Sequence, residues 1–180
     1  DMVGLDSSVL DITDAQTVEQ AVASHGPDIV INAAAYTAVD KAESDRQAAF
    51  AVNRDGPANL AVACAPRDIP LVHYSTDYVF DGSKETPYVE DDPVAPLGVY
   101  GESKLAGEKA VRQACQKHLI FRTSWVFSAH GNNFVKTMLR LGAERKELGV
   151  VADQFGKPTA ATEIARVTLD ILAQGATQWG

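Results

Sequence analysis

The sequence has little of several features that define whole classes of protein. Its 180 residues include only two cysteines, Cys64 and Cys115, with no CxxC pair and no Cys/His cluster. This pattern excludes a disulfide scaffold, and we expect reduced, structural cysteines. No uncharged apolar run approaches the roughly 20 residues of a membrane-spanning helix, and the start of the sequence has no signal-peptide pattern. We therefore expect a cytoplasmic protein with no membrane partner.

Basic charge is also scarce. The chain has 16 Lys and Arg residues against 24 Asp and Glu residues, which gives a formal net charge of -8. Such a chain repels phosphate backbones on average, and its basic residues form no stripe, so nucleic acid is not an expected partner. No metal is expected either, because no metal-ligand spacing links the four histidines, His25, His73, His118 and His130.

The hydrophobic pattern indicates an α/β fold. Segments with helical period alternate with short apolar runs, as in strands joined by crossover helices around a parallel sheet. A doubly wound, Rossmann-like sheet is the expected architecture. The expected helices are 13–24, 40–52, 56–65, 100–115, 132–145 and 162–173, and the expected strands are 28–33, 69–75, 119–123 and 148–152. Residues 13–16 match a capping box, and residues 77–99 form a long loop of the kind that is usually functional or disordered.

Tyr100 and Lys104 are the first residues whose spacing indicates chemistry. They lie four apart in the segment YGESK, so they share one face of the expected helix. A neighbouring cation lowers the pKa of a phenol, and Lys104 would thereby make Tyr100 a usable proton donor. A solvated surface pair is the alternative that spacing alone leaves open.

Thr76 lies at the carboxyl end of an expected strand, and a crossover loop leads from it to the helix of Tyr100. Ligands of open α/β sheets bind at this edge. The hydroxyl of Thr76 would then hydrogen-bond the substrate oxygen that Tyr100 protonates. The alternative is a turn residue that caps the strand end.

Five segments together resemble a known family. STDYVFDG (75–82) and YGESKLAGE (100–108) resemble the paired signature of the dTDP-4-dehydrorhamnose reductases, a family of extended short-chain dehydrogenase/reductases. NAAAYTAVDKAE (32–43), RTSWVF (122–127) and DQFGKPT (153–159) match the same family in the same order. The resemblance covers essentially the whole chain.

The resemblance implies a catalytic triad of Thr76, Tyr100 and Lys104. Its implied activity is reduction of the C4 keto group of a nucleotide-linked deoxysugar, dTDP-4-dehydro-L-rhamnose, with NADPH or NADH. In that reaction Tyr100 protonates the alkoxide, Thr76 orients the carbonyl, and Lys104 holds the nicotinamide ribose and keeps the pKa of Tyr100 low.

The resemblance also implies binding residues outside the triad. On the cofactor side these are Asp11, Ile12, Ala35, Tyr36 and Thr37, with Tyr100 and Lys104, and on the substrate side they are Thr76, Asp77 and Trp125. The residues alone leave other interpretations open: Asp11 as an Asp before a helix cap, the alanines before Tyr36 as packing residues, and Trp125 as a core residue.

A glycine-rich turn, which such a fold uses to bind pyrophosphate at a helix N-terminus, is missing. None of the 13 glycines has GxGxxG or GxxGxxG spacing. We interpret the chain as a fragment: residues 1–180 would be a partial dinucleotide-binding domain, incomplete at both ends, with the start of a substrate-binding part towards the C-terminus.

Two alternatives to the reductase stay open. One is a regulatory or scaffold subunit of the same fold, resembling the methionine adenosyltransferase regulatory subunit, and the other is a different nucleotide-sugar reductase or epimerase of the same superfamily. A homodimer is also left open. The stretch 159–163 does not align cleanly with the family's dimer contact, so the sequence does not decide the oligomeric state. The intact Thr, Tyr and Lys set favours the reductase.

Overall fold

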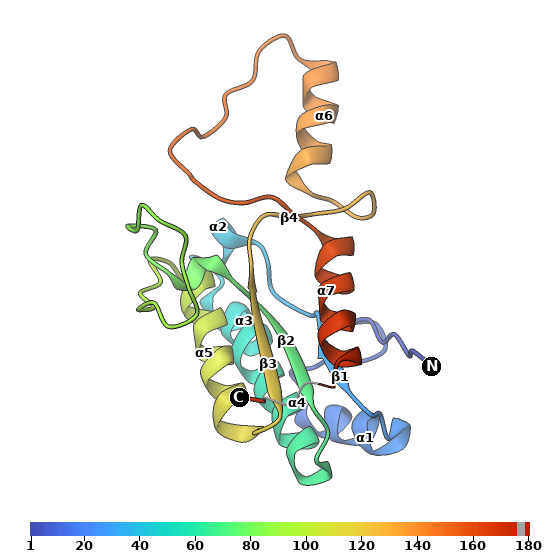
Figure 1. Cartoon of the computed structure of the whole chain (residues 1–180). Coiled ribbons are helices and arrows are strands. Elements are labelled where there is room, and N and C mark those ends of the chain that lie inside the picture. The colour runs from blue at the N-terminus through green and yellow to red at the C-terminus, as the bar shows by residue number, and fades with distance from the viewer. Residues whose placement is uncertain (176–178) are drawn as a thin grey trace. The chain divides into compact units, whose positions relative to one another are not determined.

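The computed structural model of the chain describes residues 1–175 and 179–180. It divides into two compact units, the first comprising Asp1–Arg122 with Trp179–Gly180 and the second comprising Thr123–Gln178. Each unit is described by itself, and Figure 1 labels their elements. The assignment of the whole chain to one partial dinucleotide-binding domain stays a prediction.

The first unit alternates helices with strands. Its elements are α1 (Ala15–His25), β1 (Val30–Asn32), α2 (Val39–Ala42), α3 (Arg46–Phe50), the π-helix η1 (Ala51–Asp55), α4 (Gly56–Cys64), the 3-10 helix η2 (Ala65–Arg67), β2 (Leu71–Thr76), the 3-10 helix η3 (Asp77–Val79), α5 (Val99–Ala114) and β3 (His118–Thr123), whose last residue belongs to the second unit.

The strands form a sheet in the order β1-β2-β3, with β1 and β2 parallel and Asn32 opposite His73. Figure 1 shows all three strands running in one direction. Helices α4 and α5 contact β2, and α1 packs against α4. The expected parallel α/β sheet is therefore confirmed, and the carboxyl ends of the strands meet at one edge.

The main core of this unit is apolar and well shielded. It lies between the sheet and the helices, and its fully buried members are Val18, Ala61, Cys64, Leu71 and Val111. Both cysteines are free and buried. Burial of such side chains is the dominant favourable contribution to folding.

Glycines let the helix α5 approach its neighbours closely. A Cβ on Gly107 would lie 2.1 Å from the backbone oxygen of Asn53, and one on Gly101 would lie 2.2 Å from that of Tyr78. Neither position can accept a side chain without movement of backbone. The two contacts fix α5 against η1 and η3, and they thereby place the residues between them.

Two expected helix boundaries were wrong. Helix α1 begins at Ala15 rather than at residue 13, because Asp14 caps it and accepts from the backbone N–H groups of Gln16 and Thr17. The break expected between residues 52 and 56 is filled by the π-helix η1, which joins α3 to α4. π-helical turns are rare and are frequent at functional sites.

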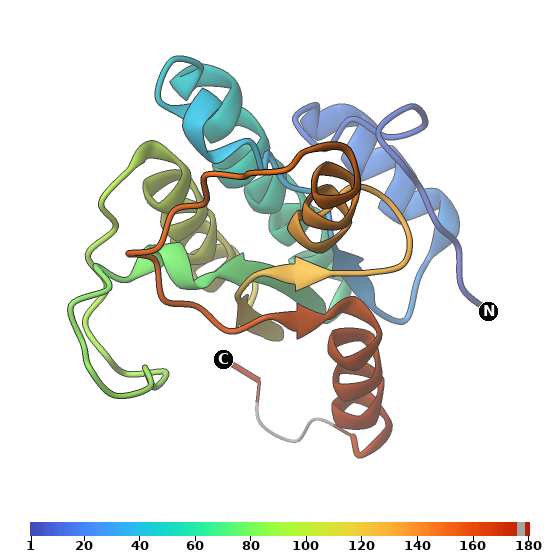
Figure 2. The same ribbon diagram turned by 90° about the horizontal axis from the view of Figure 1, so that it is seen from above.

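The long loop expected at residues 77–99 is present and has internal order. After η3 it runs without regular structure over residues 80–98. Its base is held by a cluster of Val79, Phe80 and Leu105, and the Tyr88 ring stacks on Phe80 with centroids 4.1 Å apart. Figure 2 shows the loop standing out from β2 and α5.

The second unit contains a short pair of parallel strands, β4 (Val126–Phe127) and β5 (Thr159–Ala160), and two helices, α6 (Phe134–Glu144) and α7 (Ala161–Ala173). The strand expected at residues 148–152 is wrong. That stretch is irregular, and Val150 and Val151 are exposed. A β-branched run forms a strand only where a partner strand supplies its hydrogen bonds.

Candidate active site

Thr76, Tyr100 and Lys104 come from two elements that meet at the carboxyl edge of the sheet. Thr76 is the last residue of β2, and the other two lie one turn apart on α5. Thr76 and Tyr100 lie close enough together for the Thr76 side chain to lower the pKa of Tyr100. The structure thus brings the three sequence-predicted residues together. The alternative, a solvated surface pair of Tyr100 and Lys104, does not predict that Thr76 lies beside them.

Tyr100 is half-buried between neighbouring aromatic rings and an apolar cluster. Its ring meets that of Tyr78 edge-on, with centroids 5.4 Å apart, and it packs with Tyr36 against Val99. Burial raises the pKa of Tyr100 above its ordinary value, while the hydrogen bond with Thr76 lowers it and the charge of Asp77 raises it. The phenol is therefore held in its protonated form at neutral pH.

Lys104 has a buried ammonium, with only 2% of the residue exposed. Its Nζ donates to the backbone oxygen of Tyr74 at 2.6 Å. Burial lowers the pKa of Lys104 to about 8, and the charge of Glu108 opposes that shift. Burial of the phenol raises the pKa of Tyr100 in the chain itself. The role of Lys104 in keeping that pKa low, together with the charge of the oxidised cofactor, stays a prediction.

The predicted cofactor-side loop follows β1 and is held by two buried asparagines. Asn32 Oδ1 accepts from the backbone N–H of Ala34 at 3.0 Å. Asn53 accepts from the backbone N–H of Tyr36 at 2.8 Å and donates to its carbonyl at 3.0 Å. Ala35 is half-buried, whereas Thr37 is exposed. The loop backbone is therefore fixed in place beside the edge of the sheet.

Asp11 and Ile12 lie just before α1. Asp11 is exposed, and its Oδ1 accepts from the backbone N–H and the hydroxyl of Thr13 at 2.9 and 2.8 Å, which lowers the pKa of Asp11. Ile12 packs against the main core, and a Cβ on Gly56 would lie 2.4 Å from its Cδ1. The structure thus gives Asp11 a turn-forming role in addition to the predicted contact with adenine.

Trp125 belongs to the second unit. It is 43% exposed, so the alternative of a core tryptophan is wrong. Its φ of 45° lies in the left-handed region, and its ring lies so close to Gly156 that a Cβ there would meet the ring at 2.5 Å. Strained backbone of this kind clusters at functional sites, and a half-exposed indole suits the predicted contact with substrate.

Sequence reasoning missed three polar residues that hold the site. Asn53 is fully buried and joins the loop to α5, because its Nδ2 donates to Ser103 Oγ at 3.0 Å. His73 Nδ1 lies 3.1 Å from Asn32 Nδ2. Glu43 Oε1 accepts from the backbone N–H of Val99 at 2.8 Å and caps α5. For Asn53 and His73 the one sequence signal was a polar residue within or at the end of an apolar run, and Glu43 had no such signal.

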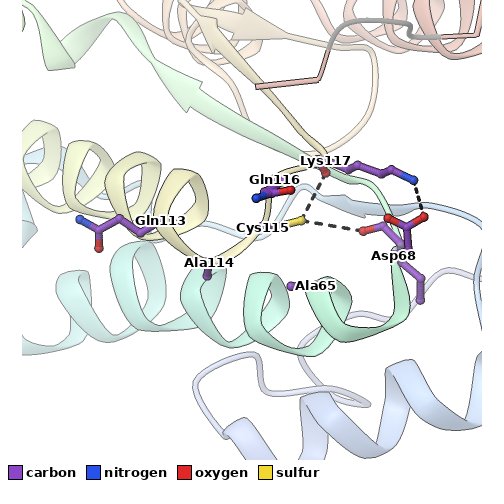
Figure 3. A pocket seen from close by; sticks show the side chains of 8 residues that line it. Ala65, Asp68, Gln113, Ala114, Cys115, Gln116 and Lys117 are labelled. Carbon is purple, nitrogen blue, oxygen red and sulfur yellow. Dashed lines mark hydrogen bonds and ion pairs between the residues drawn. The ribbon is translucent and has the colours of Figure 1, made fainter.

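The described residues contain no group of three or more His, Cys, Asp and Glu side chains that could hold a metal ion. Within the same residues, no helix is both long and apolar enough to cross a membrane. A surface hollow of about 350 Å³ lies at the opposite, amino-terminal end of β2 and β3 (Figure 3). It is lined by Asp68, Cys115 and Lys117 among others, away from Thr76.

A parallel sheet with Thr, Tyr and Lys at its carboxyl edge defines a Rossmann-like fold of the short-chain dehydrogenase/reductase kind. All of residues 1–180 match the family described as RmlD substrate binding domain, and the chain belongs to that family. It is 53% identical over 161 residues to dTDP-4-dehydrorhamnose reductase of Sinorhizobium fredii, with 89% of this chain and 54% of that protein covered.

Other similar proteins are dTDP-4-dehydrorhamnose reductases as well. The chain is 49% identical to dTDP-4-dehydrorhamnose reductase of Escherichia coli K12, with 94% of this chain and 62% of the relative covered. The structure of dTDP-4-dehydrorhamnose reductase from Bacillus anthracis, in complex with NADP, matches with a TM-score of 0.92 at 45% identity, over 98% of this chain and 62% of the other. The chain therefore spans little more than half the length of these relatives.

Proposed function

We propose that this chain is the catalytic part of an NAD(P)H-dependent reductase that acts on the C4 keto group of a dTDP-linked 6-deoxysugar. The observation that carries the proposal is the meeting of Thr76, at the end of β2, with Tyr100 and the buried ammonium of Lys104 on α5. Membership of the RmlD family supports the substrate class, and the NADP complex of the Bacillus anthracis relative supports the cofactor class.

The residues present fit the nicotinamide half of a dinucleotide. Exposed alanines at the end of β1, Ala33 and Ala34, leave room for close approach, and the loop that follows is fixed by Asn53. An ammonium has three N–H donors, of which Tyr74 takes one from Lys104. In the proposal the remaining donors of Lys104 hold the ribose hydroxyls, while Asp11 and Ile12 face the adenine and Ala35, Tyr36 and Thr37 line the cofactor.

A bound nicotinamide supplies hydride to the carbonyl carbon of the sugar. In the proposal Tyr100 donates its phenolic proton to the carbonyl oxygen, so that the C=O group becomes CH–OH. Thr76 orients that oxygen through its hydroxyl, with Asp77 beside it. A phenol that is protonated at neutral pH is the form that this step consumes.

On the substrate side, Trp125 is proposed to offer a flat apolar face to the sugar or to the nucleotide end. Its exposed indole and left-handed backbone support this role. A homodimer and a cytoplasmic location stay predictions, and so does the choice between NADPH and NADH.

The test is an assay of the complete gene product with dTDP-4-dehydro-L-rhamnose and either NADPH or NADH. We expect cofactor oxidation that depends on the sugar and formation of dTDP-L-rhamnose, identified by mass spectrometry and NMR. A UDP-linked 4-keto sugar is the matched comparison, because it tests the nucleotide separately from the keto group. Absence of turnover with both cofactors would contradict the reductase and favour a scaffold subunit.

A further inference from the structure

An ion pair between the buried Glu108 of α5 and the partly buried Arg122 of β3 lies beside the candidate active site. Glu108 is only 1% exposed, and the guanidinium of Arg122 donates two hydrogen bonds to its carboxylate. Arg122 Nε donates to Oε1 at 3.0 Å, and Nη2 donates to Oε2 at 2.7 Å. Such a two-pronged contact fixes the orientation of both partners as well as their separation.

The same carboxylate binds the strand that carries Thr76. Ser75 Oγ donates to Glu108 Oε1 at 2.6 Å, and Ser75 immediately precedes Thr76 at the end of β2. Glu108 also lies four residues after Lys104 and eight after Tyr100, so all three residues share one face of α5. One side chain therefore joins the strand of Thr76 to the helix of Tyr100 and Lys104.

Arg122 extends these contacts to the long loop of residues 80–98. Its Nη1 donates to the backbone oxygen of Glu90 at 3.4 Å, and its guanidinium lies 5.0 Å from the centroid of the Phe80 ring. Strand β3, which carries Arg122, is thereby attached both to α5 and to the loop beside the site. The ion pair is the point where four segments of the first unit meet.

Stability alone does not account for such a pair. Desolvation of the buried carboxylate and of the largely buried guanidinium offsets their attraction, and well-packed neutral residues in place of such a pair are often equally stable. A carboxylate with three directional donors does, however, restrict geometry more tightly than apolar packing. Reaction rates depend steeply on the alignment of groups that act on one atom.

We propose that Ser75, Glu108 and Arg122 form a positioning group that holds Thr76 in register with Tyr100 and Lys104. None of the three touches the reacting atoms; each acts through the strand or helix that it fixes. The proposal rests on the function proposed above, because it assigns these residues to that same reaction.

The test is the double substitution Glu108→Gln with Arg122→Met in the complete gene product. It removes both charges together, so the pair has no net charge before or after, and neither partner is left buried and unpaired. We expect kcat to fall at least about 10-fold while KM for sugar and cofactor changes less than about 3-fold. Arg112→Met is the matched control, because the exposed Arg112 also approaches Glu108, at 4.0 Å, and its loss should leave kcat within about 2-fold.

A second measurement tests the placement of Thr76 beside Tyr100 without measuring turnover. Carbon-13-labelled tyrosine would report the pKa of Tyr100 by NMR, with Tyr100→Phe used for assignment. If β2 and α5 lose register, the hydrogen bond with Thr76 weakens and the pKa of Tyr100 rises, by at least about 0.5 in the double variant. Asp77 and Tyr78, which face Tyr100 from η3, and Lys104 on α5 itself are unchanged in that variant.

The outcomes separate the two proposals. A folded double variant with kcat within about 2-fold of the unmodified protein and an unchanged Tyr100 titration would overturn the positioning role. If the double variant does not fold, Ser75→Ala keeps the ion pair and should lower kcat at least about 3-fold, and an unchanged kcat would overturn the role. If the unmodified protein has no reductase activity, the proposed function fails and the Tyr100 titration alone decides.

Discussion

The two units of the chain differ in how completely they bury their apolar residues. The first unit contains three apolar clusters, with Val18, Leu71 and Val111 fully inaccessible. In the described part of the second unit, α6 holds no buried residue, and the only buried residue of α7 is Thr168. Phe134 and Leu139, both on α6, are 59% and 71% exposed.

This difference shows that a helix can form through local interactions without packing its apolar face into a core. Helix α6 has a proper N-cap, in which Asn133 accepts from the backbone N–H of Lys136, and it has a clear apolar face. Most helical stability in proteins comes from packing such a face. The first unit does so with buried contacts between elements distant in sequence, whereas α6 is defined by local interactions. We therefore expect Thr76, Tyr100 and Lys104 to be held by the better-packed first unit.

The largest expected effect is a contrast in hydrogen exchange. Backbone amides of β2 should exchange at least about 1000-fold more slowly than those of α6, because the opening of buried elements approaches global unfolding while poorly packed elements open locally. Exchange monitored by mass spectrometry or NMR on the 180-residue chain measures this directly. Equal protection in β2 and α6 would contradict the comparison.

Glycine substitutions in the two long helices should have opposite signs. Gly107→Ala in α5 places a Cβ 2.1 Å from the backbone oxygen of Asn53, and overpacking of this kind should cost about 2–3 kcal/mol. Gly142→Ala in α6 meets no atom within 4 Å, and it should stabilise that helix by about 0.5–1 kcal/mol through helix propensity alone.

Urea unfolding measures both variants, with probes in each unit. The two changes are chemically identical, so each serves as the control of the other. A destabilising Gly142→Ala, or a neutral Gly107→Ala, would show that the difference in packing between α5 and α6 is not real.

A smaller effect concerns acid. His73 is fully buried, and burial lowers its pKa from the ordinary value of 6.5 to about 3, with the charge of Lys104 acting in the same direction. The folded state keeps the imidazole neutral while the unfolded chain binds a proton below pH 6.5. The contribution of the neutral His73 to the free energy of unfolding is therefore complete above pH 6.5 and is lost as the pH falls towards about 3.

The expected slope is at most about 1.4 kcal/mol per pH unit in the stability of the first unit. Unfolding of that unit, followed between pH 6.5 and about 4, measures the slope. His73→Asn keeps an acceptor near Asn32 and does not titrate, so the slope should flatten in that variant. An equal slope in both proteins would assign the acid sensitivity to other groups.

Much of the first unit could be predicted from sequence. Apolar runs and helical periods gave the strands around residues 30 and 72 and the helix of Tyr100, because each element packs its apolar residues with a regular period. The π-helix η1 could not be predicted: it contains Asn53, whose backbone lies against Gly107 of α5, a contact between segments far apart in sequence. Tertiary contacts decide such details, and local patterns do not contain them.

The same limit applies to the candidate site. Thr76, Tyr100 and Lys104 followed from motif and position, and the structure places them at the end of β2 and on the neighbouring helix α5. Glu108 and Arg122 lie in the motifs YGESKLAGE and RTSWVF, but their pairing joins residues 14 apart across the fold. Likewise, the expected strand at residues 148–152 failed because sequence cannot show whether a partner strand is present.

The central claim, that Tyr100 is the proton donor of a reductase, is tested most directly by Tyr100→Phe in the complete gene product. Tyr78→Phe is the matched control, because its ring lies 5.4 Å from that of Tyr100 and loses the same hydroxyl. We predict that turnover of dTDP-4-dehydro-L-rhamnose falls at least about 100-fold in Tyr100→Phe, with cofactor affinity within a few-fold, and less than about 5-fold in Tyr78→Phe. Equal turnover in Tyr100→Phe and the unmodified protein would contradict the account.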